Sequence, residues 1–235
     1  MRRTSEMRAL LIAILALTLI SASRAIPTGP VIISNSTDSG PSNAGTLVSI
    51  PGGTITTYLL NATQQNLRWK AFVGNVTGKY LLQDSYNYSI YDWSLTITSG
   101  EVYATRASSV SWGNVNCSTT AQISAEETAL NQNSANPDTI SKTFSSNTHA
   151  AFAVGTVSIP ANTCKSTATN VNGQPQSTYF QEVLLHDQAS AFIYTALLSV
   201  GQTGYNNQKF DFQMIVPEDE ITPGNTQYYL YVELI

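Results

Sequence analysis

Charged side chains are scarce in this chain of 235 residues, since Asp, Glu, Lys and Arg make up only 11% of it. That fraction is less than half of the usual quarter of residues. Acidic residues outnumber basic ones, 15 against 11, for a net charge of −4. Nucleic acids and anionic lipid surfaces both require basic protein surface, so the composition argues against either as a partner. A neutral polar surface is instead typical of proteins that are glycosylated or packed against copies of themselves.

Histidine and recognisable enzyme motifs are equally scarce. The two histidines, His149 and His186, lack metal-ligand spacing, and no nucleophile elbow, H-E-x-x-H or phosphate-binding loop occurs. His186 is followed by Asp187, which offers a base beside a carboxylate, but the surrounding residues predict a strand end that enters a turn. We therefore expect no enzyme; an activity would need residues such as Glu101 and His186.

Long hydrophobic runs are missing apart from one near the start. Basic residues within 1–8 precede an uncharged apolar stretch, 9–22, which at about 14 residues is shorter than the roughly 20 that span a bilayer. Small residues follow at Ser23 and Ala25, so the order predicts a secretory signal peptide over 1–25 and a mature chain without a membrane span. The alternative is a pilin-type signal cut after the last of the early arginines, which two prolines just beyond the run disfavour because they keep the retained helix short.

Only two cysteines occur, Cys117 and Cys164. In an exported protein such a lone pair is most often joined in a disulfide. The bridge would close a loop of about 48 residues and stabilise the fold by about 4 kcal/mol on the chain-entropy estimate. Two buried free thiols are the alternative, which the predicted signal peptide disfavours.

Asparagine is abundant and forms five N-x-S/T glycosylation sequons, all in the first half of the chain. They begin at Asn35, Asn61, Asn75, Asn87 and Asn116. We expect several of them to carry glycans in a host with N-glycosylation. Chance matches in a chain rich in Asn and Thr are the alternative.

Short runs of β-branched and aromatic residues, separated by turn residues, recur from residue 55 onward. The expected strands are 57–60, 67–73, 79–83, 89–97, 101–106, 151–159, 178–185, 191–199, 209–216 and 227–234. Strand starts roughly 10 residues apart are typical of an antiparallel sandwich. We predict an all-β, antiparallel β-sandwich of jelly-roll type over residues 55–235, with an insertion at about 107–165. Clean alternation over 209–214 predicts one buried and one solvated face there.

One short helix is expected inside the insertion. Ser124 followed three residues later by Glu127 matches a capping box, which predicts a helix from Ala125 to about Gln132. The Asn136-Pro137-Asp138 run then prevents further helix.

Six stretches of the β-rich region carry a resemblance to a known group of proteins. They are 69–78, 91–93, 100–104, 180–185, 210–218 and 228–234. Together they resemble the two halves of a module found in archaeal secreted and cell-surface proteins, over roughly residues 55–235. That group is functionally uncharacterised, so the resemblance implies a location and a fold type and supplies no active site.

Residues 26–54 are poor in charge and rich in Pro, Gly, Ser and Asn, which predicts an extended N-terminal arm or linker. Val31, Ile32 and Ile33 form one apolar, β-prone island in it. Such a segment can add to an exposed sheet edge of a neighbouring subunit, and head-to-tail addition that does not close produces filaments. Alternatively, the island pairs within its own domain or stays unstructured.

Two binding sites are weaker candidates. Trp69 and Trp93 could stack on sugar rings, with Asp84, Asp92 and Glu101 as the paired carboxylates of a glycosidase. Alternatively, the two tryptophans simply fill the core. The acidic run 218–220 offers oxygen ligands for calcium but lacks the spaced pattern of an EF-hand. We therefore expect no cofactor, with calcium as a weak alternative.

These features predict a non-catalytic extracellular or cell-surface structural protein, a filament or coat subunit assembled by N-terminal strand donation. Its expected partners are copies of itself, other cell-surface proteins or polysaccharide. A carbohydrate-binding or adhesive module is the alternative function.

Overall fold

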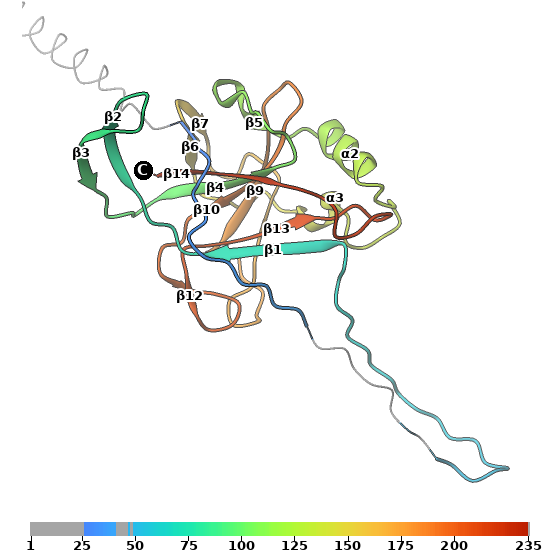
Figure 1. The fold of residues 1–235 in the computed structure, drawn as a ribbon. Coiled ribbons are helices and arrows are strands. Elements are labelled where there is room, and N and C mark those ends of the chain that lie inside the picture. The colour runs from blue at the N-terminus through green and yellow to red at the C-terminus, as the bar shows by residue number, and fades with distance from the viewer. Residues whose placement is uncertain (1–25, 41–46, 48, 235) are drawn as a thin grey trace, which may run out of the picture.

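The centre of the molecule is a six-stranded sheet in which every pairing is antiparallel (Figure 1). Its order is β14 (Tyr229–Leu234), β4 (Gly100–Thr105), β10 (Phe192–Leu197), β9 (Gln181–His186) and β5 (Asn116–Cys117), while β8 (Ser166–Ala168) also pairs with β9. This computed structural model describes residues 26–40, 47 and 49–234. The predicted signal peptide lies outside those residues.

The central strands are buried on both faces because alternate side chains feed two separate cores. In β4, Val102 and Ala104 enter one core, while Tyr103 between them enters the other. The same division occurs in β10, where Tyr194 and Ile193 belong to opposite cores. Successive side chains of a strand point to opposite faces of its sheet, so a continuous apolar run there reflects burial on both sides.

The first core is closed by a second, smaller layer. Strand β13 (Phe212–Pro217) pairs antiparallel with β1 (Trp69–Gly74), and these two strands form a sheet of their own. Met214 and Val216 of β13 are buried in this core, and Phe144 from the end of α3 (Ile140–Thr143) packs there with them.

The second core is covered by segments that lie just before Cys117 in the sequence and between Cys117 and Cys164. They include η1 (Trp112–Asn114), β6 (Phe152–Val154) and β7 (Val157–Ile159), the last two forming a hairpin. Cys117 and Cys164 are joined in a disulfide that spans 47 positions of sequence, which confirms the predicted bridge. Cys164 is fully buried among this apolar cluster.

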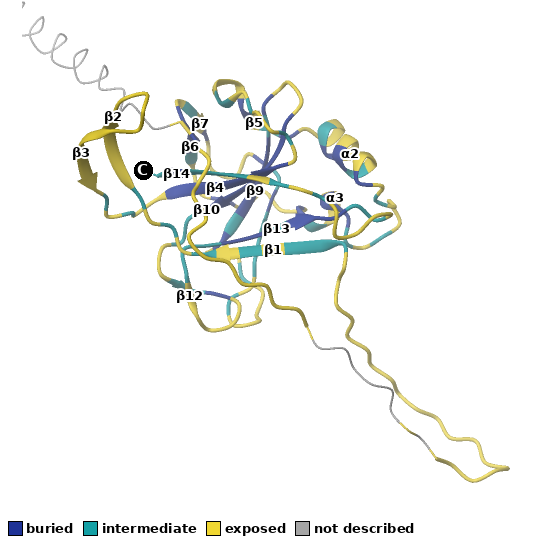
Figure 2. Cartoon of the chain, viewed as in Figure 1, coloured by how far each residue is buried: buried dark blue, intermediate teal, exposed yellow. Residues whose placement is uncertain are grey.

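Two further hairpins lie at the periphery. Strands β11 (Gln202–Thr203) and β12 (Lys209–Phe210) form one, and β2 (Lys79–Gln83) and β3 (Ser89–Ser94) form the other. Every residue of β2 and β3 is exposed, and Figure 2 shows this hairpin standing outside the buried layers. The all-β, antiparallel class predicted from the sequence is thus confirmed.

The helix prediction was wrong in its start and in the number of helices. Helix α2 covers Thr120–Ala129, and its capping box is formed by Thr119 and Gln122, so Ser124 lies inside the helix. The sequence contains two successive capping-box patterns, at 119–122 and 124–127, and the earlier one places Ile123 in the core. The helix ends at Leu130, and Asn131 then takes a left-handed conformation with φ of 55°, as residues that follow a helix often do.

Three of the expected strands differ from the structure. Residues 57–60 form no strand and are exposed. The expected strand 151–159 is the β6–β7 hairpin, and 209–216 is broken at Asp211, whose carboxylate accepts N–H groups from Gly201 and Val76. The predicted solvated face holds at Lys209, which is exposed, but is wrong at Gln213, which is buried and whose amide donates to Thr169 and Asn170.

The described residues of the first 66, namely 26–40, 47 and 49–66, form an extended excursion from the domain. It begins beside β14, runs outward, turns near Gly52 and Gly53, and returns to β1 (Figure 1). Within the described residues, no helix has the length and apolar character needed to cross a membrane.

Candidate functional site

The residues considered for catalysis lie in different parts of the fold. Glu101 is buried in β4, directly opposite Glu233 of β14. His186 ends β9, two strands away. Asp92, on the exposed β3, forms an ion pair with Lys79, and this partner holds the pKa of Asp92 below its ordinary value. The structure therefore does not bring these carboxylates and the histidine into one cluster.

His186 and Asp187 are adjacent, but their hydrogen bonds serve the turn that follows β9. His186 Nδ1 accepts the backbone N–H of Gln188 at 2.9 Å and lies 3.9 Å from the Asp187 carboxylate. A base oriented by a carboxylate needs its ring N–H to donate to that carboxylate. The Asp187 carboxylate instead accepts the backbone N–H groups of Ser111, Ala189, Ser190 and Ala191. Burial raises its pKa, but these bonds outweigh burial and leave the pKa lowered.

His149 is buried next to the disulfide. Its Nε2 accepts the backbone N–H groups of Thr163 and Cys164, at 3.1 and 3.0 Å. Because Nε2 is an acceptor, the ring proton belongs on Nδ1, which lies 2.8 Å from the carbonyl oxygen of Ala150. Nε2 thus holds the loop that carries Cys164, while Nδ1 bonds the neighbouring residue of the histidine's own segment.

The acidic run considered for calcium points its carboxylates in different directions. Glu218 forms an ion pair with Lys70, Asp219 accepts the N–H groups of Ile221 and Thr222, and Glu220 pairs with Arg68. Over the described ranges, no three His, Cys, Asp or Glu side chains gather in a metal-binding group. These acids therefore fasten loops to β1 and α2.

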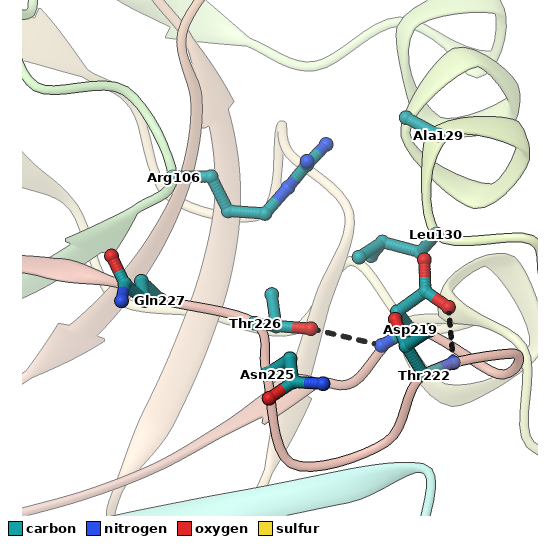
Figure 3. Close-up of a pocket in the computed structure, with 8 residues that line it drawn as sticks. All are labelled: Arg106, Ala129, Leu130, Asp219, Thr222, Asn225, Thr226 and Gln227. Atoms are coloured by element: carbon teal, nitrogen blue, oxygen red, sulfur yellow. Dashed lines mark hydrogen bonds between the residues drawn. The ribbon is translucent and has the colours of Figure 1, made fainter.

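A hollow of about 350 Å³ lies between the end of α2 and the loop before β14 (Figure 3). Two charged side chains line it, Arg106 and Asp219. Arg106 is bound to both carboxylate oxygens of Glu126 at 2.9 and 2.6 Å, and the Asp219 N–H donates to the Thr226 hydroxyl. Both charges that line this hollow are thus engaged, Arg106 by Glu126 of α2, and the Asp219 carboxylate by N–H groups of its own loop.

The two tryptophans considered for sugar binding have different environments. Trp69 packs against Phe144 at a ring distance of 6.2 Å, and its Nε1–H donates to the Asp138 carbonyl oxygen. Trp93 lies on β3, is 48% exposed and contacts Tyr91 at 4.8 Å. Trp69 therefore belongs to the core, and Trp93 to the surface.

One face of the β2–β3 hairpin is aromatic and apolar. Tyr80 lies opposite Trp93, and Leu82 lies opposite Tyr91; residues directly opposite in an antiparallel pair share a face. These four side chains are 43–59% exposed, and a hollow of about 290 Å³ lies along β3. The sequence pointed to Trp93 but not to this face. Every second residue of each strand contributes to the face, so the sequence could have indicated it once the two strands were known to pair.

The N-terminal arm touches the domain at the open edge of the six-stranded sheet. Thr28 and Val232 of β14 exchange two backbone hydrogen bonds, of 3.0 and 2.8 Å, in an isolated antiparallel bridge. Pro27 is buried. Continuing the register would place Pro30 opposite Leu230, where proline has no N–H to donate, so the pairing stops after one bridge.

Beyond this bridge, the apolar island of the arm is unburied. Val31, Ile32 and Ile33 are 88%, 67% and 85% exposed. Since neighbouring residues of a strand direct their N–H and C=O groups to opposite sides, Leu230 and Leu234 direct theirs to the same open side as Val232. Among the described residues this side of β14 carries one backbone bridge, to Thr28, and its Leu234 carbonyl oxygen accepts the Tyr80 hydroxyl, so an exposed apolar segment lies next to a strand edge with few partners.

All five sequon asparagines are exposed. Asn35 and Asn61 lie on the excursion, Asn75 follows β1, Asn87 lies in the β2–β3 turn, and Asn116 begins β5. The first four stand on segments outside the six-stranded sheet, so a glycan there would not disturb it.

Comparison with protein-family models, with curated proteins and with solved structures finds no match for this chain.

Proposed function

We propose that the protein is a non-catalytic extracellular structural subunit whose copies assemble by exchanging their N-terminal arms. The observation that carries the proposal is the single Thr28–Val232 bridge at the open edge of β14, followed by three exposed apolar residues. In an assembly, the arm of one copy would occupy the edge of the next, and Val31–Ile33 would pack against that neighbour.

The arm loses little interaction free energy when it leaves its own domain. Its backbone bridge to β14 consists of two hydrogen bonds, each worth about 1 kcal/mol net. An exchanged arm forms the same bonds with a neighbour, so exchange costs little beyond the entropy of association. Burial of Val31, Ile32 and Ile33 would then add about 1.5–3 kcal/mol for each side chain fully buried.

Three features support an extracellular location. The sequence predicts a signal peptide, the two cysteines form a disulfide of the kind typical of oxidising compartments, and the five sequon asparagines are exposed. The resemblance to archaeal secreted and cell-surface proteins points the same way. A jelly-roll sandwich is also part of this proposal. The single chain has a two-stranded sheet, β1–β13, against a six-stranded one. The smaller sheet would become a fuller second layer only when further strands are added to it.

The test uses the mature chain, residues 26–235, imaged by negative-stain electron microscopy over a concentration series. We expect ordered filaments or sheets, and dispersed particles when Val31, Ile32 and Ile33 are all changed to Ser. The matched control is Ile221→Ser, because Ile221 is also exposed, at 72%, and lies in a loop far along the chain. Dispersed particles from the unchanged chain at every concentration, or assembly of the triple variant, would reject arm exchange.

Binding of polysaccharide by the β2–β3 hairpin is the second candidate function. It is favoured by the exposed aromatic face, in which Tyr91 and Trp93 lie 4.8 Å apart. Here Trp93→Ala should abolish retention on a polysaccharide column with the unfolding temperature unchanged. Tyr205→Ala is the control, since Tyr205 is exposed to a similar degree, 47%, on another hairpin. Equal retention of both variants would reject this site.

A further inference from the structure

We infer that residues 54–60 of one copy add as a strand to the outer edge of β1 in a second copy. This contact is separate from the arm exchange proposed above, since it uses another donor segment and another sheet edge.

The donor segment has the composition of a strand but forms none within its own chain. Its sequence, Thr-Ile-Thr-Thr-Tyr-Leu-Leu, is uncharged and dominated by β-branched and aromatic residues, which are the residue types enriched in strands. Ile55, Leu59 and Leu60 are 99%, 101% and 85% exposed. Full exposure of a strand-prone apolar run indicates that its pairing partner is missing from the isolated chain.

The excursion holds this segment away from its own domain. The return leg is fastened where it meets the domain, because the Asn66 amide and the Arg68 guanidinium both bind the carboxylate of Asp138. The two legs run side by side near Gly40 and Gln65, and Figure 1 shows them carrying the turn outward. The segment is therefore presented to another molecule.

The acceptor is an edge of β1 that has no strand beside it in the described part of the chain. Strand β1 pairs only with β13 there. The Arg68 carbonyl oxygen accepts the Glu218 N–H across that pair, so alternation directs the N–H and C=O groups of Trp69, Ala71 and Val73 to the outer side. Ala71 and Val73 are exposed, so the face of β1 that carries their side chains is uncovered.

The side chains around this edge are only partly covered. Phe72 and Val76 pack against the first core but stay half-exposed, and so do Leu230 and Val232 on β14. The chain just after β1 passes the end of β14, since a Cβ atom on Gly78 would meet Leu234. A strand added to β1 would lie over this partly covered margin of the first core.

A second copy is the occupant because the donor and the acceptor belong to the same chain. One copy offers residues 54–60 and receives the same segment at a different surface, which makes the contact heterologous and able to propagate head to tail. The donor carries no charge, and backbone pairing between strands requires none. Addition at β1 would enlarge the two-stranded layer to three strands.

Cysteine cross-linking between different molecules tests this inference. Both natural cysteines are closed in the disulfide, so Thr57→Cys in one full mature chain and Ala71→Cys in another each introduce one new thiol. We expect a mixed dimer on a non-reducing gel after mild oxidation, and the same for Ile55→Cys with Val73→Cys, because antiparallel pairing that sets Thr57 opposite Ala71 also sets Ile55 opposite Val73. In the control mixture, Asn206→Cys replaces Thr57→Cys, because Asn206 is exposed in a distant loop, and we expect no mixed dimer.

Two results would overturn the inference. One is the absence of mixed dimers from both pairs. The other is an internal bridge in a chain carrying Thr57→Cys and Ala71→Cys together while the mixed chains stay monomeric, since that would mean the segment folds back on its own β1.

A background substitution separates this contact from arm exchange. The mixed dimer should persist when both chains also carry Ser at Val31, Ile32 and Ile33, and its loss there would overturn the claim of a separate interface. Adding Leu59→Asp to the chain that carries Thr57→Cys should lower the yield by about tenfold or more, because a buried leucine is replaced by a charge. Ile221→Asp in the same chain should leave the yield unchanged, and an equal loss from both would contradict docking of residues 54–60.

Discussion

Strands β10 and β1 belong to the same chain but have opposite surroundings. Strand β10 lies between β9 and β4, and every one of its residues is buried. Strand β1 has one neighbour among the described residues, and none of its own residues is fully buried. The interior around β10 is therefore complete within one molecule, whereas the layer that contains β1 ends at an open edge.

Aromatic residues show the same contrast. Tyr194 of β10 is fully buried and contacts Phe144, Phe192 and Tyr228. Trp93 contacts Tyr91 and is half exposed. We call the buried interior around β10 the complete region. Side chains there stabilise the monomer, while those near the open edges are available to a partner.

The largest expected difference is between Phe144→Ala and Leu59→Ala. Phe144 is fully buried in the first core, so its truncation should lower the free energy of unfolding by about 3–5 kcal/mol. Leu59 is fully exposed, and its change should stay within about 0.5 kcal/mol. Urea unfolding of dilute, monomeric protein measures both. A large loss of stability for Leu59→Ala would mean that residues 54–60 pack in the monomer.

The two tryptophans give a smaller difference. Trp69→Ala removes a half-buried ring and the hydrogen bond to Asp138, so it should cost about 2–3 kcal/mol, less than a fully buried aromatic. Trp93→Ala should change stability by less than about 0.5 kcal/mol. Thermal unfolding followed by circular dichroism would compare them. Equal losses would contradict the assignment of Trp93 to the surface.

Glu182 provides a pH-dependent measure of the complete region. It is fully buried in β9; burial raises its pKa well above the ordinary value, although its carboxylate accepts the Ile215 N–H, which lowers it. Below the unfolded pKa of about 4.3 the carboxyl is protonated in both states and costs no stability. As the pH rises through that value towards the folded pKa, only the unfolded state ionises, and stability is lost.

Glu182→Gln should remove this loss. Relative to the unchanged protein, the variant should gain about 1.4 kcal/mol for each pH unit between the unfolded pKa and the folded pKa. The comparison is made as a difference between the two proteins at pH 3 and pH 7, because Asp187, Glu218 and Asp219 have lowered pKa values and act in the opposite direction. If the two proteins differ in free energy of unfolding by the same amount at pH 3 and at pH 7, then folding does not raise the pKa of Glu182.

The sequence predicted the complete region better than the open one. Strand β4 (Gly100–Thr105) matches the expected 101–106 to within one residue, β10 lies within the expected range 191–199, and Cys117 and Cys164 pair as expected. These predictions rest on local composition and turn residues, which act over a few neighbours. The start of α2 was missed because two capping-box patterns follow one another, at 119–122 and 124–127, and the helix uses the earlier one.

Long-range partners were beyond the sequence. Residues 57–60 have a clear strand signal, yet the domain offers them no strand to pair with in its described part. The turn held by Asp187 and the buried amide of Gln213 depend on backbone groups distant in sequence. The arm was predicted, but its bridge to β14 through Thr28 was not.

The smallest expected effect concerns that bridge. Thr28→Pro removes the N–H that donates to the Val232 carbonyl oxygen, which should lower stability by about 1 kcal/mol or less. The sharper readout is hydrogen exchange at the Val232 amide, which donates to Thr28; its protection should fall, while that of Ile193 in β10 stays unchanged. Thr28→Ala keeps the backbone N–H and should keep the protection. Because exchanged arms would protect the same amide, protection of Val232 in the unchanged protein should rise with protein concentration if copies exchange arms, and a concentration-independent value would confine the bridge to a single chain.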